Sequence, residues 1–244
     1  MSSLTAFSFS EDGESMNCLL MSNCPWANTE RCNSMCYIYA EFDYLLNNSN
    51  IPEGHKTFNE PINPTRDDYQ SFVTLREIKT DIANFVEDGR FLYIWSHNTG
   101  NYKTTWAMKM VKTFLAVVSV GNNFQDRAWV EYIPTFLLLA KNFDNKETRQ
   151  EHIHRAMTND LVVLDDIGAV QNTNYDLTNL SSIIDYRYSN NLATIFTSNV
   201  SPVDLANVMG ARLCDRITSD IVINLVGASR RSSTKTYTRG RKNS

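Results

Sequence analysis

The sequence SHNTGNYKTT at residues 96–105 lies between two segments of different hydrophobic period. Residues 91–95 form a short apolar run typical of a buried strand, and residues 103–118 carry apolar side chains at helical spacing. A loop between a strand and a helix is suited to bind phosphate, because the first helical N–H groups are free and the helix dipole is positive there. The stretch therefore predicts a phosphate-binding loop.

The match to the phosphate-loop pattern G-x-x-x-x-G-K-[ST] is incomplete. Lys103 is placed to reach the β- and γ-phosphates and Thr104 to ligate Mg²⁺. His97 and Tyr102 stand where the pattern has glycine, which lets a backbone approach phosphate without a Cβ. We therefore expect nucleotide binding with slow hydrolysis. The predicted nucleotide-binding residues of the loop are His97, Asn98, Thr99, Gly100, Asn101, Tyr102, Lys103, Thr104 and Thr105.

Two later strands also end in polar side chains. Four aliphatic residues at 161–164 precede Asp165 and Asp166, which predicts that Asp165 holds Mg²⁺ and Asp166 polarises the attacking water. The run at 194–198 precedes Asn199, which would orient that water beside the γ-phosphate. The alternative is that both strands simply end in polar turns. Phosphate loop, acids and Asn199 nevertheless follow one another in the order that an ATPase needs.

Arginines near the C-terminus complete this pattern. Residues 210–216 (GARLCDR) place Arg216 on an expected helix, where it could reach the γ-phosphate of a neighbouring copy. That interpretation implies a homo-oligomer. The alternative is an ordinary solvated arginine.

The order of elements predicts the fold class. Expected strands and helices alternate, which favours a three-layer α/β/α sandwich around a parallel sheet. Turn formers at residues 47–52 suggest a boundary near residue 50, between a helical N-terminal module (1–50) and the α/β domain (51–244). We expect strands at 91–95, 127–133, 161–164, 193–197 and 221–226, and helices at 37–46, 75–86, 103–118, 176–189 and from residue 134.

Four of the five cysteines lie close together in the N-terminal module: Cys18, Cys24, Cys32 and Cys36. In a chain of the cytosol such clustering favours a metal over disulfides, and four thiolates satisfy tetrahedral Zn²⁺. The alternative is a small apolar cluster of reduced cysteines. Cys214 is expected in the core.

Charge and hydropathy limit the partners. The net charge of the 244 residues is −4, but residues 221–244 hold six Lys and Arg and no acid. This basic tail is either a solvated terminus or a contact for nucleic acid. No apolar run approaches the roughly 18 residues of a membrane span, and residues 1–14 lack a basic signal-peptide region. We therefore expect a cytoplasmic protein without a membrane partner.

From the linker to the C-terminus the chain resembles the DnaC/DnaI-like AAA+ loaders of replicative helicases, including phage versions. The resemblance implies ATP and Mg²⁺ as cofactors, and a zinc-containing N-terminal part that binds the replicative helicase and helps place it on single-stranded DNA. It also implies that Asn199 is sensor 1, Arg216 the arginine finger, and Arg230 or Arg231 the sensor 2 arginine. The segments that carry it are 100–107, 164–168, 196–199, 209–217 and 227–231.

Three other functions remain open on sequence grounds. A transposition helper ATPase would share the fold, although the cysteine-rich module argues against it. A module that sequesters a helicase without hydrolysing ATP would explain the altered phosphate loop. A sequence-specific DNA-binding initiator is less favoured, because no appended helix-turn-helix pattern follows the core.

Overall fold

The computed structural model describes residues 20, 24, 26–27, 29–33, 36–57, 61–121, 123–141, 146–168 and 174–229. Within these residues, parallel strands form one sheet in the order β2-β3-β4-β1-β5. The carboxyl ends of β1, β4 and β3 therefore lie side by side. The strands are β1 (Phe91–Trp95), β2 (Ala128–Tyr132), β3 (Leu161–Asp165), β4 (Thr194–Ser198) and β5 (Ile221–Asn224).

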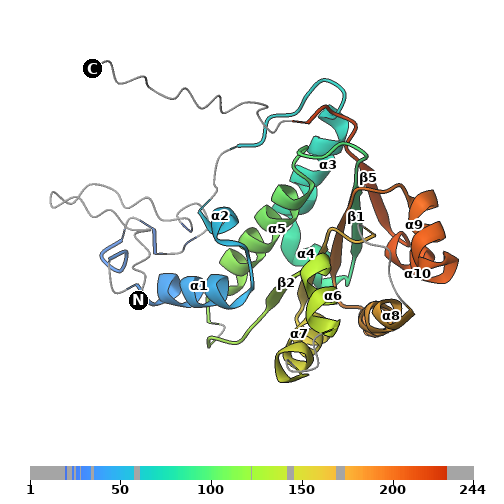
Figure 1. Cartoon of the computed structure of the whole chain (residues 1–244). Coiled ribbons are helices and arrows are strands. Elements are labelled where there is room, and N and C mark those ends of the chain that lie inside the picture. The colour runs from blue at the N-terminus through green and yellow to red at the C-terminus, as the bar shows by residue number, and fades with distance from the viewer. Residues whose placement is uncertain are drawn as a thin grey trace, which may run out of the picture.

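Helices cover both faces of this sheet (Figure 1). Helices α1, α3, α4 and α5 share a hydrophobic core on one face, and α6 to α10 share a second core on the other. The helices are α1 (Tyr37–Asn48), α2 (Glu53–Lys56), α3 (Tyr69–Thr80), α4 (Ile82–Glu87), α5 (Lys103–Val118), α6 (Ile133–Lys141), α7 (Lys146–Thr158), α8 (Asn174–Ser189), α9 (Pro202–Met209) and α10 (Ala211–Ile217).

The central strands contribute to both cores, because successive side chains of a strand point to opposite faces. In β1, Leu92 and Ile94 pack on the α5 side, whereas Phe91 and Tyr93 pack on the α6–α10 side. All residues of β3 and β4 are buried. Strands buried on both faces are typical of parallel sheets with helices on either side. The expected three-layer α/β/α architecture is thus confirmed.

Two expectations about helices differ from the structure. The helix expected over 75–86 is divided into α3 and α4, and α3 begins earlier, at Tyr69. The break lies at Asp81, whose carboxylate accepts a hydrogen bond from Asn84 Nδ2 at 2.7 Å. Such local side-chain bonds compete with continuous helix. Helix α7 has no counterpart among the expected helices, because it is largely polar and Ala156 is its one buried residue.

Residues 36–57 pack against the α/β unit. Side chains of α1 lie in the same hydrophobic core as α5: Ile38, Phe42, Leu45 and Leu46. After α1 the chain follows the outer edge of β2, where Ser49 O accepts a hydrogen bond from Val130 N (2.9 Å). Asn50 Nδ2 donates to Val130 O (2.7 Å). The segment thereby covers an edge that would otherwise expose unpaired backbone groups.

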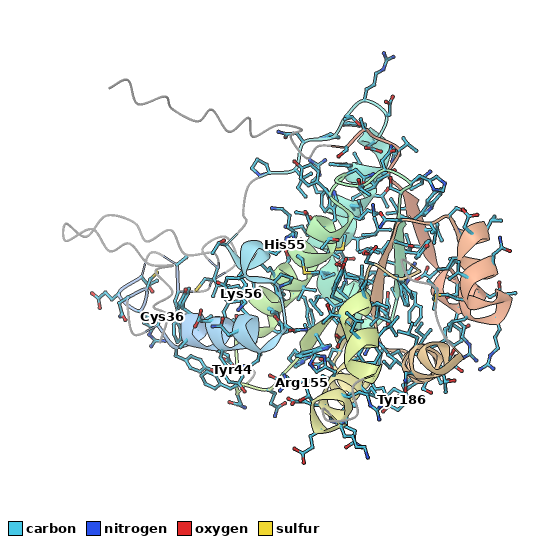
Figure 2. The ribbon with its side chains drawn as sticks, viewed as in Figure 1. Cys36, Tyr44, His55, Lys56, Arg155 and Tyr186 are labelled. Carbon is cyan, nitrogen blue, oxygen red and sulfur yellow. The ribbon has the colours of Figure 1, made fainter. Side chains whose placement is uncertain are left out.

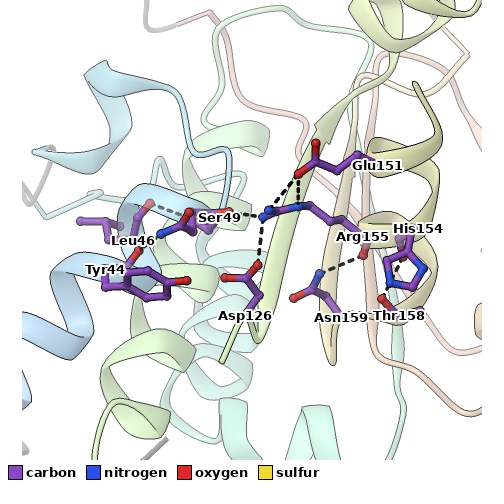
Figure 3. A network of polar contacts seen from close by, with 10 residues as sticks. Tyr44, Leu46, Ser49, Asp126, Glu151, His154, Arg155, Thr158 and Asn159 are labelled. Atoms are coloured by element: carbon purple, nitrogen blue, oxygen red, sulfur yellow. Dashed lines mark hydrogen bonds and ion pairs between the residues drawn. The ribbon is translucent and has the colours of Figure 1, made fainter. Parts of the chain in front are cut away.

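Arg155 of α7 holds the end of α1 against this unit (Figure 3). Its Nη1 donates to Asn48 O at 3.2 Å and pairs with Asp126 Oδ2 at 3.0 Å. Glu151 Oε1 lies 2.9 Å from Nη2, and the guanidinium carbon lies 5.0 Å from the centre of the Trp129 ring. One side chain therefore joins α1, α7 and the chain leading into β2.

The boundary predicted near residue 50 stays a prediction, and the core that α1 shares with α5 is the observation that bears on it. Among the helices in the described ranges, none combines the length and apolar character needed to cross a bilayer.

Candidate nucleotide-binding site

The loop of residues 96–102 joins β1 to α5, as expected. Gly100 and Tyr102 both have left-handed backbones, with φ of 77° and 70°. This conformation costs a residue with a side chain roughly 1–2 kcal/mol. Tyr102 therefore adopts the backbone for which the motif uses glycine, while its half-buried ring packs against the core that contains α5.

Asn101 and Lys103 form the inside of the loop. Asn101 is 1% exposed, and its Nδ2 donates to Ser96 Oγ (2.5 Å) and Leu225 O (2.9 Å). The Lys103 ammonium donates to Asn98 O (3.1 Å) and Asn101 Oδ1 (3.3 Å). The loop thus keeps the lysine folded over its own carbonyls, where an arriving phosphate would compete for the ammonium.

Asp165 lies at the end of β3 and is 7% exposed. Its Oδ1 accepts hydrogen bonds from Thr104 Oγ1 (2.8 Å) and Thr197 Oγ1 (2.5 Å). Burial raises the pKa of Asp165, and the bonds from Thr197 and Thr104 oppose that rise. A carboxylate beside a hydroxyl fits Mg²⁺, which takes oxygen ligands and keeps several waters. Thr104 and Asp165 are the residues that would hold this ion.

Asp166 and Asn199 contact each other across the ends of β3 and β4. Asn199 Nδ2 donates to Asp166 Oδ1 at 2.8 Å, and Asp166 N donates to Thr197 Oγ1 at 3.0 Å. Burial raises the pKa of Asp166, and the neighbouring Asp165 carboxylate raises it further. A carboxylate of raised pKa beside an amide is suited to orient a water and accept its proton.

These side chains line a cavity of about 770 Å³. That volume is within the range of small-molecule sites, roughly 300–1,000 Å³. Most of the predicted loop residues, both acids and Asn199 come together here. The lining residues are Pro52, His55, Thr99, Gly100, Asn101, Tyr102, Lys103, Thr104, Thr105, Tyr132, Asp165, Asp166, Thr197 and Asn199.

Four lining residues are absent from the sequence-based site. Thr197 had a usable signal, because it lies two positions before Asn199 at the end of a predicted strand. Pro52, His55 and Tyr132 had none. Their place depends on how α2 packs on α5 and on where β2 ends.

Two predicted loop residues make other contacts. The His97 ring packs edge-on against Trp95, with 5.1 Å between ring centres. Asn98 Nδ2 donates to Val226 O (3.1 Å) and Gly227 O (3.0 Å). The side chains of His97 and Asn98 thus contact residues beside the loop and are not among the residues that line the cavity.

The chain after β5 is held beside the phosphate loop. Asp68 accepts hydrogen bonds from Val226 N (2.7 Å) and Gly227 N (2.9 Å). A Cβ at Gly227 would lie 2.1 Å from Asp68 Oδ2, so any side chain there would displace the Asp68 carboxylate. Arg230 and Arg231 follow shortly but lie outside the described residues, and so does their predicted role.

Arg216 pairs with Asp185 of α8, and its guanidinium carbon lies 5.4 Å from the centre of the Tyr188 ring. Arg212 Nη2 binds the same carboxylate at 2.5 Å. Arg216 thus contacts α8 within its own chain. Its role toward a neighbouring copy stays a prediction.

The zinc site also stays a prediction. Cys18 lies outside the described residues, whereas Cys24, Cys32 and Cys36 are half-buried free thiols. In the described part of the chain, no three His, Cys, Asp or Glu side chains gather as a metal-binding group.

The fold is similar to that of solved AAA+ P-loop proteins. The DnaC helicase loader superposes with a TM-score of 0.54 at 21% identity, over 68% of this chain and 93% of that one. DnaI gives 0.57 at 22% identity, over 74% and 94%. AMPPCP-bound DnaA from Aquifex aeolicus gives 0.51 at 16% identity, over 67% and 48%. At such identities the likeness concerns the fold.

The sequence is also similar to that of a characterised protein. The replicative helicase loader DnaI of Bacillus subtilis (strain 168) is 29% identical over 122 residues, which span 43% of this chain and 39% of DnaI. No protein-family model matches the chain. The resemblance to DnaC/DnaI-like AAA+ helicase loaders that the sequence indicates is thereby confirmed.

Proposed function

We propose that this chain binds ATP with Mg²⁺ and, governed by that nucleotide, helps place a replicative helicase on single-stranded DNA. The observation that carries the proposal is the convergence of Lys103, Thr104, Asp165 and Asn199 on one cavity. The similarity to DnaI supports the choice of helicase loading among the functions of this fold.

Each polar group of the cavity has a role in this proposal. Lys103 binds the β- and γ-phosphates, while Thr104 and Asp165 hold Mg²⁺. Asp166 accepts a proton from the attacking water, which Asn199 orients. Magnesium, when bound, neutralises the charge that develops on the phosphates.

Nucleotide binding is tested by titrating a fluorescent ATP analogue into the protein with Mg²⁺. Lys103→Ala should weaken binding at least tenfold, because a charge-assisted phosphate contact is lost. Lys109→Ala, on the same helix and outside the cavity lining, is the matched control. If the unaltered protein fails to bind at millimolar nucleotide, the proposal is refuted.

The partners follow from the same proposal. Residues 1–50, with zinc on Cys18, Cys24, Cys32 and Cys36, would bind the helicase, and the basic tail would contact single-stranded DNA. Arg216 would act on the nucleotide of a neighbouring copy in a homo-oligomer, and Arg230 or Arg231 would be sensor 2. The protein would work in the cytoplasm.

Co-purification tests the partner. The full chain and a Cys24→Ser/Cys32→Ser variant should be mixed with the replicative helicase of the source organism, with zinc measured in both proteins. We expect zinc and a complex with the unaltered chain and neither with the double variant. Cys214→Ser is the control and should behave like the unaltered chain. A complex that survives loss of both cysteines would rule out the zinc-dependent contact.

The backbone of Tyr102 favours a second candidate, a helicase-binding protein that hydrolyses ATP poorly and holds its partner. A side chain stands where the motif needs closest approach to phosphate. ATP turnover measured with helicase and single-stranded DNA separates the two functions: stimulation indicates a loader, and its absence a sequestering protein.

A further inference from the structure

His55 is a cavity residue that comes from outside the phosphate-loop unit. It lies on the short helix α2, where α2 faces α5 (Figure 2), and its half-buried side chain lines the same cavity as Thr104 and Asp165. Of the described lining residues, only His55 and Pro52 precede β1 in the chain. The segment that directly follows α1 therefore reaches the cavity.

Two hydrogen bonds join α2 to its neighbours, and a third closes its first turn. Lys112 of α5 donates from Nζ to Lys56 O at 3.3 Å, and Lys56 Nζ donates to Asn47 Oδ1 of α1 at 3.0 Å. His55 N donates to Pro52 O at 2.8 Å. Since α1 is itself bound to the core, the imidazole is presented to the cavity by a defined scaffold.

His55 and Asp165 line the same cavity. Burial lowers the pKa of His55, the Asp165 carboxylate opposes this shift, and the Lys112 ammonium adds to it. Asp165 accepts a hydrogen bond from Thr104. The part of the cavity that these two residues line is where the metal and the terminal phosphate would lie. An imidazole N–H is a suitable donor to a phosphate oxygen, whether the ring is neutral or charged.

We propose that His55 donates a hydrogen bond to the γ-phosphate of ATP in this cavity, an inference that rests on the proposed nucleotide binding. ADP lacks this acceptor. Binding of ATP rather than ADP would then change the contacts of α2, and through them those of α1. This connects the nucleotide with the part of the chain proposed to bind helicase.

The test is calorimetric titration of the full chain with ATPγS and with ADP, both with Mg²⁺. His55→Ala should weaken ATPγS about tenfold, the usual effect of losing a hydrogen bond to a charged group, and change ADP less than twofold. His55→Gln retains an N–H donor and should recover part of the loss. His154→Ala is the matched control, because His154 is exposed on α7 and outside the cavity lining.

Amide hydrogen exchange over residues 49–57 provides a second readout. Protection by ATPγS beyond that by ADP should be present in the unaltered protein and lost in His55→Ala. Equal weakening of both nucleotides, or no weakening, would overturn the role of His55 while leaving nucleotide binding intact. If the unaltered protein binds neither nucleotide, the proposed function falls, and this inference with it.

Discussion

Tyr102 is the residue on which the expected rate of ATP hydrolysis depends most directly. Its backbone is left-handed, with φ of 70°, and it stands directly before Lys103. Tyr102→Gly removes strain of roughly 1–2 kcal/mol. It also frees the unfolded chain, at a cost of roughly 0.5–1 kcal/mol, and removes the packing of the ring. We therefore expect little net change in the melting temperature but ATP turnover at least severalfold higher, measured as phosphate release.

A second substitution separates the two ways in which Tyr102 could hinder turnover. Tyr102→Ala removes the ring but keeps the Cβ and the backbone strain. Should alanine raise turnover as much as glycine, the ring is the obstacle; should only glycine do so, the obstacle is the Cβ. Unchanged turnover in both variants would contradict the expectation that Tyr102 slows hydrolysis.

For single residues of the cavity, the sequence predicted some positions well and others not at all. The place of Lys103, Asp165 and Asn199 at one cavity could be predicted, because each directly borders an element with a clear hydrophobic period. His55 could not, because nothing in its local sequence indicates that α2 packs on α5 beside Asp165.

At the scale of elements, α7 and β2 are joined by an ion pair that titrates. His152 Nδ1 lies 2.9 Å from Glu131 Oε2, which also accepts a hydrogen bond from Trp129 Nε1 at 3.0 Å. The hydrogen bond to Glu131 raises the pKa of His152. A pKa higher in the folded than in the unfolded state stabilises the fold below the unfolded value, about 6.5. This stability is lost as the pH rises through the folded pKa.

Urea unfolding at pH 6 and pH 8 measures this contribution. The free energy of unfolding should fall between these values more steeply in the unaltered protein than in His152→Gln, which cannot titrate. His154→Gln, on the same helix and exposed, should retain the full slope. Identical slopes in all three proteins would show that the pair does not contribute.

Arg187 joins the ends of α7, α8 and β4 in the second core. It is fully buried and donates to Asn159 O (2.8 Å), Ala193 O (2.6 Å) and Thr194 Oγ1 (2.8 Å). A lysine ammonium cannot span these acceptors, so Arg187→Lys leaves carbonyls such as Asn159 O without the guanidinium donor, while Ala193 O keeps its bond from Val162 N.

We expect Arg187→Lys to lower the free energy of unfolding by about 2–4 kcal/mol, since each unpaired buried polar group costs roughly 1–3 kcal/mol. Arg76→Lys, at an exposed position of α3, should stay within about 0.5 kcal/mol of the unaltered protein. Denaturant unfolding measures both. A loss below about 1 kcal/mol for Arg187→Lys would mean that the acceptors find other partners.

At the scale of the whole molecule, the sheet could be predicted more completely than the connection of the N-terminal region. The strands β1, β3 and β4 are almost entirely buried, and β1 and β3 read as continuous apolar runs, so these strands were the most visible in the sequence. Helix α1 was also visible, but an amphipathic pattern does not say which surface covers it. The turn formers at 47–52 suggested a linker, whereas Ser49 and Asn50 bind the edge of β2.

This connection predicts that two truncations separated by only 15 residues behave differently. Removing residues 1–35 deletes the buried Leu20 and the partly buried Cys24 and Trp26 from the core that α1 shares with α5 but leaves α1 in place. Removing residues 1–50 deletes Ile38, Phe42, Leu45 and Leu46 from the core shared with α5, and burial of each such side chain contributes about 1.5–3 kcal/mol. It also exposes the edge of β2.

Residues 36–244 should therefore unfold cooperatively near the melting temperature of the full chain. Residues 51–244 should instead aggregate or melt at least roughly 10 °C lower, on the order expected for such a loss. Equal melting temperatures for the two fragments would show that α1 belongs to a separate module, as the turn formers alone suggest. A fragment that has lost part of its core can also lose its partners for that reason alone. Residues 36–244 are therefore the appropriate deletion to compare with the full chain when asking whether the cysteine-rich N-terminus binds helicase.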